Sequence, residues 1–185
     1  MNRCTKWTCC LMLAALVVAF AFPAAGSGSR RGVAMIDGCT DSGIGGFALL
    51  REARSDEGVK EVTITLVVTG LTDGKHAVHL HETAACEPCG AAGGHFDPGP
   101  NSNSSPDGNH PFHLGDLINV ESRNGLGVMQ TTTSRVTLSP GVLSLFDDDG
   151  SAFIIHKNPD TYCPDGEEAG CAGGGRDACG IITRR

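Results

Sequence analysis

The chain has 185 residues, which leaves room for one domain at roughly 100–200 residues per domain. With 40% hydrophobic and 19% charged residues it is too apolar for a disordered chain, and its 26 Gly and 9 Pro with only 5% aromatics favour short elements joined by turns over a helical bundle. The net charge of −7 argues against nucleic acid as a partner, because phosphate binding needs dense Lys and Arg.

The first 26 residues have the pattern of a secretory signal peptide. Arg3 and Lys6 precede an apolar run at residues 11–22, and small residues follow it. The alternative is a membrane anchor, but its 17 apolar or small residues are at the lower limit for crossing ~30 Å of hydrocarbon. We therefore expect cleavage near Gly26, a mature domain at residues 27–185 with no stable membrane insertion, and a secreted location, extracellular or periplasmic.

Cleavage would remove three of the nine cysteines and take the net charge from −7 to −9. An even number of cysteines in an exported chain predicts disulfides rather than zinc thiolates. Six cysteines allow 15 pairings, so their number alone does not choose among them. The six are Cys39, Cys86, Cys89, Cys163, Cys171 and Cys179.

Short β-rich runs alternate with turn residues along the rest of the chain. The run at residues 59–69 alternates apolar and polar positions, as a half-buried strand does, and Asn124-Gly125 predicts a tight hairpin. These patterns predict an all-β sandwich or closed barrel of seven or eight strands. The expected strands are residues 32–37, 46–50, 59–69, 76–81, 116–121, 126–133, 151–156 and 180–183.

Two stretches lack this rhythm and are expected to carry function. Residues 82–111 and 159–175 are long and rich in Gly, and loops of such length in a compact domain are usually functional.

The histidines lie in and around the first of these loops. His79 and His81 are two apart on an expected strand, so both project from one face and can share a metal. His76 is three residues before His79, which points it to the other face, and we interpret it as a structural, hydrogen-bonded histidine. His113 lies three residues before Asp116.

His95 follows a Gly-rich bend, and His156 ends the apolar run at residues 153–155. With the cysteines assigned to disulfides, nitrogen and oxygen donors of this kind suit copper or zinc.

Five motifs in this order resemble those of the copper/zinc superoxide dismutase family, and the resemblance spans about residues 32–182. It implies an antiparallel Greek-key β-barrel or sandwich of about eight strands with two long functional loops. The motifs are KHAVHLH at residues 75–81, CGAAGGHFDP at 89–98, HLGDL at 113–117, HKNPD at 156–160 and RDACGII at 176–182.

The resemblance implies conversion of superoxide to dioxygen and hydrogen peroxide by copper redox cycling, with zinc beside the copper. His95 would bridge the two metals and deliver a proton, and Arg176 would attract superoxide. Asp160 would link the histidines of the two metals from behind. The implied copper ligands are His79, His81, His95 and His156, and the motifs also place His95, His113 and Asp116 at zinc.

One zinc ligand departs from the family pattern. Eight residues after the bridging histidine the family usually has another histidine, but this chain has Asn103. We expect His110 to replace it, and the alternative is a loop histidine beside a weakened or empty zinc site. Asn103 also begins an Asn-Ser-Ser glycosylation sequon, which would place it at the surface.

The resemblance further implies a disulfide between Cys89 and Cys179. Four cysteines then remain, and we expect Cys163 to pair with Cys171 across one loop, leaving Cys39 to Cys86. The competing function is a secreted copper-binding or copper-delivery module on the same fold. A homodimer fits the family, although the matched motifs contain none of its contacts.

Overall fold

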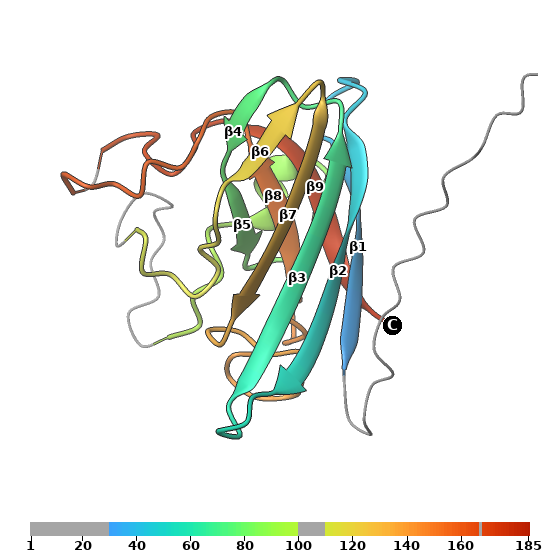
Figure 1. The fold of residues 1–185 in the computed structure, drawn as a ribbon, viewed down its shortest axis with the longest axis vertical. Helices are drawn as coiled ribbons and strands as arrows, with labels where there is room; N and C mark the ends of the chain where they lie inside the picture. The colour runs from blue at the N-terminus through green and yellow to red at the C-terminus, as the bar shows by residue number, and fades with distance from the viewer. Residues whose placement is uncertain (1–29, 100–109, 167) are drawn as a thin grey trace, which may run out of the picture.

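Nine antiparallel strands form one sheet in the computed structural model, which describes residues 30–99, 110–166 and 168–185 (Figure 1). A 3-10 helix, η1 (Cys89–Ala92), is the only helical element in these ranges, and none of the helical structure there could cross a membrane. The predicted signal peptide lies outside the described residues. The strands are β1 (Arg31–Gly38), β2 (Gly45–Arg54), β3 (Lys60–Thr69), β4 (Gly74–His76), β5 (Val78–His81), β6 (Val120–Arg123), β7 (Leu126–Thr133), β8 (Ala152–His156) and β9 (Arg176–Arg184).

The sheet nearly closes into a barrel. Its strand order is β4-β6-β7-β3-β2-β1-β9-β8-β5, and the two outer strands, β4 and β5, are separated in the chain only by Ala77. The connections from β3 to β4 and from β7 to β8 join strands that are not neighbours, as in a Greek key. The predicted all-β fold is confirmed. The expected strand at residues 76–81 is two strands, because β4 pairs with β6 whereas β5 pairs with β8.

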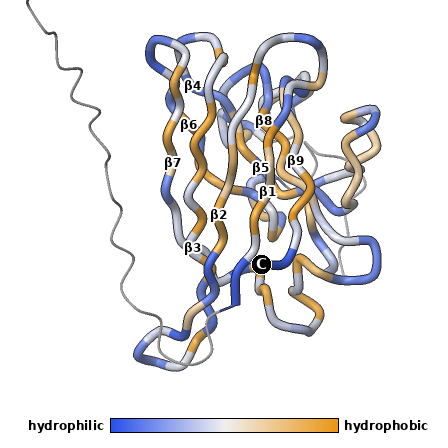
Figure 2. Tube along the Cα trace, turned by 90° about the vertical axis from the view of Figure 1, so that its right-hand side faces the viewer, coloured by the Kyte–Doolittle hydropathy of each residue, from blue (hydrophilic) through white to orange (hydrophobic). Residues whose placement is uncertain are grey.

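The apolar face of each strand fills the barrel. In β3, the alternate residues Val62, Ile64, Leu66 and Val68 are fully buried, as their period of two predicts. Hydrophobic segments follow the strands in Figure 2, whereas the hairpin between β2 and β3 is hydrophilic.

The β6–β7 hairpin forms at the predicted Asn124-Gly125 turn. Both residues have positive φ angles, 52° and 76°, and Arg123 pairs with Leu126 on either side of them. A two-residue turn with positive φ at both positions matches the twist of the flanking strands, which is why Asn-Gly is favoured there.

The two long loops lie on the same side of the barrel (Figure 1). The side chain of Asn119, in the segment between the first loop and β6, holds the second loop, because its Oδ1 accepts a hydrogen bond from Asp160 N at 2.7 Å and its Nδ2 donates one to Asp160 O at 3.0 Å. The residues expected to carry function are thereby brought together.

All six cysteines of the described residues form disulfides, and two of the three expected pairings are wrong. Cys163 pairs with Cys171 as expected, but the other four cysteines exchange partners. The disulfides are Cys39–Cys89, Cys86–Cys179 and Cys163–Cys171, in place of Cys89–Cys179 and Cys39–Cys86.

The exchange has a simple physical reason. Cys39 lies directly after β1, where its N–H donates to Asp177 O at 2.8 Å, so Cys39 and Cys179 come from neighbouring strands. Cys86 and Cys89 are only three residues apart in the loop that packs against both. In each observed bond the Cα atoms are 5.7 Å apart, within the normal range. Either pairing would tie the loop to the same two strands, and motif spacing cannot distinguish them.

Candidate metal centre

The β5 strand presents two buried histidines to the loops. His79 and His81 project from one face of β5. Val78, before the first histidine, and Leu80, between the two, fill the barrel core. Both histidines are fully buried although they face away from that core. The cover comes from the loops, including the segment around His95, which forms a bridge with His81.

His95 and His156 complete a group of four histidines. The ligand atoms of His79, His81, His95 and His156 all lie within 4.8 Å of one another, and all four residues are buried. His156 ends β8, where the register with β9 shifts between Ile155 and His156.

In each of the four rings one nitrogen is held by the protein, which orients the other. His81 Nδ1 lies 3.0 Å from Gly93 O, and His156 Nδ1 lies 2.9 Å from Gly174 O. The Nε2 atoms of His81 and His95 are buried without a hydrogen-bond partner. A buried polar atom without a partner is costly, so these nitrogens fit a metal ion well.

Burial keeps three of these rings neutral. Burial, together with neighbouring histidines, lowers the pKa of His95 to about 4 and that of His156 to about 3. Burial also lowers the pKa of His81 well below its usual 6.5. Neutral imidazoles are the protonation state that binds copper or zinc.

A second donor group lies beside the first. His79, His95, His110 and Asp116 bring their ligand atoms within 4.8 Å of one another. His95 Nδ1 is 2.7 Å from Asp116 Oδ1, so His95 belongs to both groups, one through each nitrogen. His113 adjoins them, with Nδ1 3.3 Å from Asp116 Oδ2.

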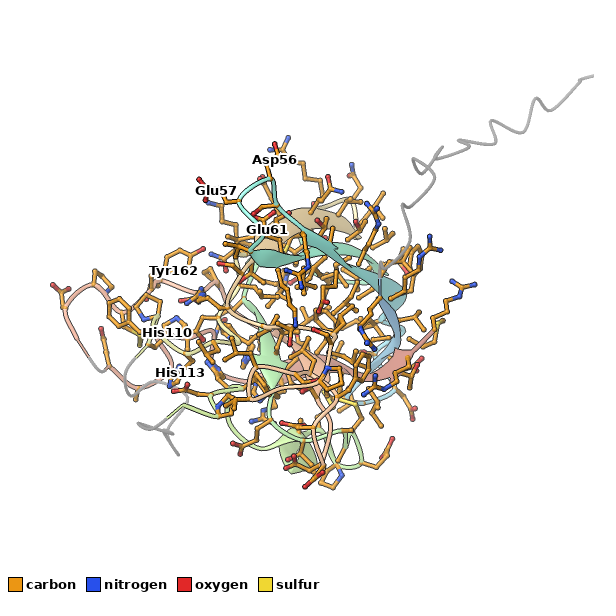
Figure 3. All side chains as sticks on the ribbon, turned by 90° about the horizontal axis from the view of Figure 1, so that it is seen from below. Asp56, Glu57, Glu61, His110, His113 and Tyr162 are labelled. Atoms are coloured by element: carbon orange, nitrogen blue, oxygen red, sulfur yellow. A yellow bond between two sulfur atoms is a disulfide. The ribbon has the colours of Figure 1, made fainter. Side chains whose placement is uncertain are left out.

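His110 is turned toward this second group. Its Nδ1 lies 3.1 Å from Asp116 Oδ2 but makes no hydrogen bond, and both ring nitrogens of His113 are also buried without a partner. His110 and His113 lie together among the loops at the side of the barrel, apart from the acidic hairpin of Asp56 and Glu57 (Figure 3).

Asp160 joins the two donor groups from behind. Its Oδ2 lies 3.0 Å from His79 Nε2 and 2.8 Å from His110 Nε2, and its Oδ1 accepts from Tyr162 N at 2.6 Å. These contacts occupy the Nε2 atoms of His79 and His110 and leave their Nδ1 atoms for the donor groups. A carboxylate behind a ligating histidine fixes the ring and raises its basicity.

The carboxylates dominate the electrostatics of the second group. Burial opposes charge at His110, but its interactions with the Asp116 and Asp160 carboxylates outweigh burial and raise the pKa of His110 to about 9. Burial alone would raise the pKa values of both carboxyl groups. Interactions with nearby histidines, with His110 the largest contributor in each case, instead hold these pKa values well below their usual range. Excess negative charge of this kind favours a bound cation.

Arg176 lies at the edge of the first group. Its guanidinium donates hydrogen bonds to Cys89 O at 2.7 Å and Gly93 O at 2.5 Å, and it is half-buried. The positive charge is close enough to contribute to the lowered pKa values of His81 and His156.

Two further sequence predictions concern residues outside the donor groups. His76 is buried and structural, as expected, because its Nδ1 lies 2.9 Å from His156 O and its Nε2 2.9 Å from Thr72 O. Asn103, with its sequon, lies outside the described residues, so its glycosylation stays a prediction.

Sequence reasoning missed the residues that hold the site from outside. Asn119 fixes the backbone of Asp160, and Glu82 accepts a hydrogen bond from Gly94 N at 2.8 Å beside His95. Neither position belongs to a motif or a recognisable spacing. Only the contact between segments distant in the chain reveals their roles.

Comparison with known proteins agrees with this geometry. Residues 44–182 match the family described as copper/zinc superoxide dismutase (SODC). Two bacterial proteins named Superoxide dismutase [Cu-Zn] are similar to the chain. The one from Legionella pneumophila is 41% identical over 124 residues, covering 65% of this chain and 70% of its own length. The one from Deinococcus radiodurans is 35% identical over 138 residues, covering 64% and 69%.

A vertebrate protein extends the comparison. Superoxide dismutase [Cu-Zn] A of Xenopus laevis is 31% identical over 138 residues, which cover 72% of this chain and 87% of that protein. The family match takes in every residue of the two donor groups and Arg176. Sequence, fold and site thus agree, and the chain belongs to the copper/zinc superoxide dismutase family.

Proposed function

We infer that this protein is a superoxide dismutase that uses copper and zinc. Two superoxide ions and two protons give one dioxygen and one hydrogen peroxide, so one superoxide is oxidised and the other reduced. The observation that carries this inference is the convergence of four buried histidines beside a half-buried arginine, with a second His/Asp group that shares His79 and His95.

The ring nitrogens that no carbonyl or carboxylate holds support one assignment of the copper ligands, and two of them, His79 Nδ1 and His156 Nε2, lie 3.1 Å apart. We propose that the copper ligands are His79 through Nδ1 and His81, His95 and His156 through Nε2. In each case the other ring nitrogen already contacts Asp160, Gly93 O, Asp116 or Gly174 O.

The zinc ligands are proposed to be His95, His110, His113 and Asp116. His110 replaces the histidine that the family usually has at the position of Asn103. Support comes from its two nitrogens: Nε2 contacts Asp160, whereas Nδ1 is buried, has no hydrogen bond and faces Asp116.

Copper supplies a centre that takes up and returns one electron in alternation. The protein attracts and orients the substrate through Arg176, whose guanidinium is fixed by the carbonyls of Cys89 and Gly93. A focused positive field of this kind raises the encounter rate with an anion although the protein is acidic as a whole. When His95 Nε2 is not bound to copper, it would hold a proton and deliver it to the reduced oxygen species, while Asp116 keeps the ring in place through Nδ1.

The test is metal content per chain and superoxide dismutation measured on the same purified sample. We expect about one copper and one zinc per chain and an activity per copper far above that of free copper. Activity no greater than that of free copper would instead favour a copper-delivery module. Copper and high activity without zinc, even after zinc loading, would contradict the proposed zinc ligands.

We further propose that the protein works outside the cytoplasm, in the extracellular space or the periplasm. The three disulfides support this, because such bonds persist in oxidising compartments. Alkylation and mass analysis of the protein from its native host would detect them, and free thiols at all six positions would contradict the proposal.

A homodimer is also proposed, through the outer face of the barrel. Exposed apolar side chains on β9, β1, β2 and β7, with the partly exposed Val67 of β3 between the last two, form a continuous row there: Ile181, Met35, Phe47 and Val128. Pairing of two such faces about a twofold axis would bury the same patch on both copies. We expect Met35→Glu to give a monomer in sedimentation velocity, while Val142→Glu, at an exposed apolar residue elsewhere, leaves the dimer intact. A wild-type monomer would refute the proposal.

A further inference from the structure

The segment that carries three of the four proposed zinc donors is held by one arginine. Arg135 Nη2 donates a hydrogen bond to Asp116 O at 2.7 Å, and its Nη1 donates to His113 O at 3.0 Å and to Pro111 O at 3.4 Å. One guanidinium thus contacts the main chain of both His113 and Asp116, and of the residue after His110.

The main chain of Arg135 is attached to the barrel. It comes two residues after the end of β7, its own N–H donates to Thr133 Oγ1 at 3.1 Å, and the next residue, Val136, is fully buried in the core. The guanidinium therefore connects a rigid part of the fold to a loop that has little regular structure of its own.

Nothing among the described residues competes for this guanidinium. Arg135 forms no ion pair within them, and the hydrogen bonds of its side chain all go to main-chain oxygens of the loop. It lines a surface groove of about 480 Å³ between the loop and β7, to which Asp116 and Tyr162 also contribute. The exposed guanidinium of Arg135 thus donates hydrogen bonds to the main chain of the segment that carries the proposed zinc ligands. This arrangement can orient His113 and Asp116.

We propose that Arg135 is a positioning residue for the zinc site, which fixes the main chain of His113 and Asp116 and thereby the geometry of the zinc donors. This inference rests on the proposed zinc ligands. Arginine suits the role because its planar group can donate in several directions at once, whereas a lysine ammonium acts as a point charge. Residues that hold metal ligands from behind commonly change metal affinity 10–100-fold when they are replaced.

The first experiment compares zinc dissociation constants of the wild type, Arg135→Ala and Arg135→Lys by chelator competition, with copper loaded equally. We expect zinc binding to weaken about 10–100-fold in Arg135→Ala and by a smaller factor in Arg135→Lys. Cobalt(II) placed in the zinc site should show a changed visible spectrum in Arg135→Ala, because the donor geometry is no longer fixed. Added methylguanidinium should enter the vacated groove and partly restore zinc affinity in Arg135→Ala alone.

Two control variants distinguish an effect on the geometry of the zinc ligands from a general loss of protein stability. Arg123→Ala removes an exposed arginine that pairs with Glu121, and Glu52→Gln removes hydrogen bonds to another loop. Both should keep the wild-type zinc affinity and cobalt spectrum, even if Glu52→Gln is less stable. Wild-type affinity and spectrum in Arg135→Ala would overturn the inference and leave the zinc site intact. A wild type that binds no zinc would overturn the zinc site itself, and this inference with it.

Discussion

His110 and Asp160 are in direct contact although fifty residues separate them in the chain. The Nε2 atom of His110 lies 2.9 Å from Asp160 Oδ1 and 2.8 Å from Asp160 Oδ2. Since Asp160 also contacts His79, this pair connects the second donor group to the first. The burial of His110 against two carboxylates supports the proposal that it is a zinc ligand and not a loop histidine without a role.

Replacing His110 should therefore remove zinc and spare copper. We expect His110→Ala to bind copper at about one ion per chain but to lose zinc, because one donor of four is gone and Asp116 loses a partner. Elemental analysis after dialysis against both metals measures this. Asn103→Gln is the matched control and should keep both metals. Zinc retained by His110→Ala but lost by Asn103→Gln would reverse the assignment.

Asp160→Asn should weaken zinc binding about 10–100-fold, because the neutral amide no longer holds His79 and His110 through charge-assisted bonds. In the metal-free protein the same change should lower the pKa of His110 from about 9, since one of its two carboxylate partners is lost. An NMR titration of the ring protons measures that shift. An unchanged His110 pKa in Asp160→Asn would show that the contact with Asp160 does not form in solution.

Arg176→Ala should lower dismutation about tenfold or more at low salt while copper content stays at the wild-type level. The positive charge beside the first donor group is lost, and the remaining activity should depend less on ionic strength. Steady-state rates over a series of salt concentrations measure both effects. Arg184→Ala, which removes an exposed arginine on the far part of β9, is the control and should behave like the wild type. Equal low-salt rates for Arg176→Ala and the wild type would contradict the role of this charge.

The strands and the shared face of His79 and His81 were predictable because they depend on local patterns. The alternation in β3, the Asn-Gly turn and the two-residue spacing of His79 and His81 each encode local geometry. The disulfide partners depend on how a loop packs against β1 and β9, and Cys86 and Cys89 are too close in sequence for a pattern to separate them.

The supports of the site were not predictable for a similar reason. Asn119 and Arg135 act through main-chain atoms of segments that lie at least 19 residues away in sequence. Main-chain carbonyl groups are present in every residue. The sequence therefore does not show which residue a side chain binds when the bond is to the main chain. Only the folded backbone shows which ones it reaches.

Glu52 offers a test of stability that does not involve the metals. Its side chain is only 7% exposed, and Oε2 accepts hydrogen bonds from Leu138 N at 2.6 Å and Ser139 N at 2.8 Å. Burial opposes its charge, but these hydrogen bonds and the charge of Lys60 together lower the pKa of Glu52 below its usual 4.5. The carboxylate thus ties β2 to the loop that follows β7.

A carboxyl group whose pKa is lower in the folded state stabilises that state above the unfolded pKa, and this contribution is lost as the pH falls through the folded pKa. We expect Glu52→Gln to lower the free energy of unfolding by about 1–3 kcal/mol at pH 7, because the bonds from Leu138 and Ser139 are weakened. The deficit relative to the wild type should shrink as the pH falls below 4.5 and through the lower pKa of Glu52 in the folded state, where the wild-type carboxyl group becomes protonated. Urea unfolding of the metal-free, disulfide-intact proteins at two pH values, pH 7 and an acidic one below the pKa of Glu52 in the folded state, measures this deficit. Glu57→Gln, at the exposed hairpin tip, should match the wild type throughout, and a Glu52→Gln deficit that is the same at both pH values would show that the carboxylate charge is not what stabilises the loop.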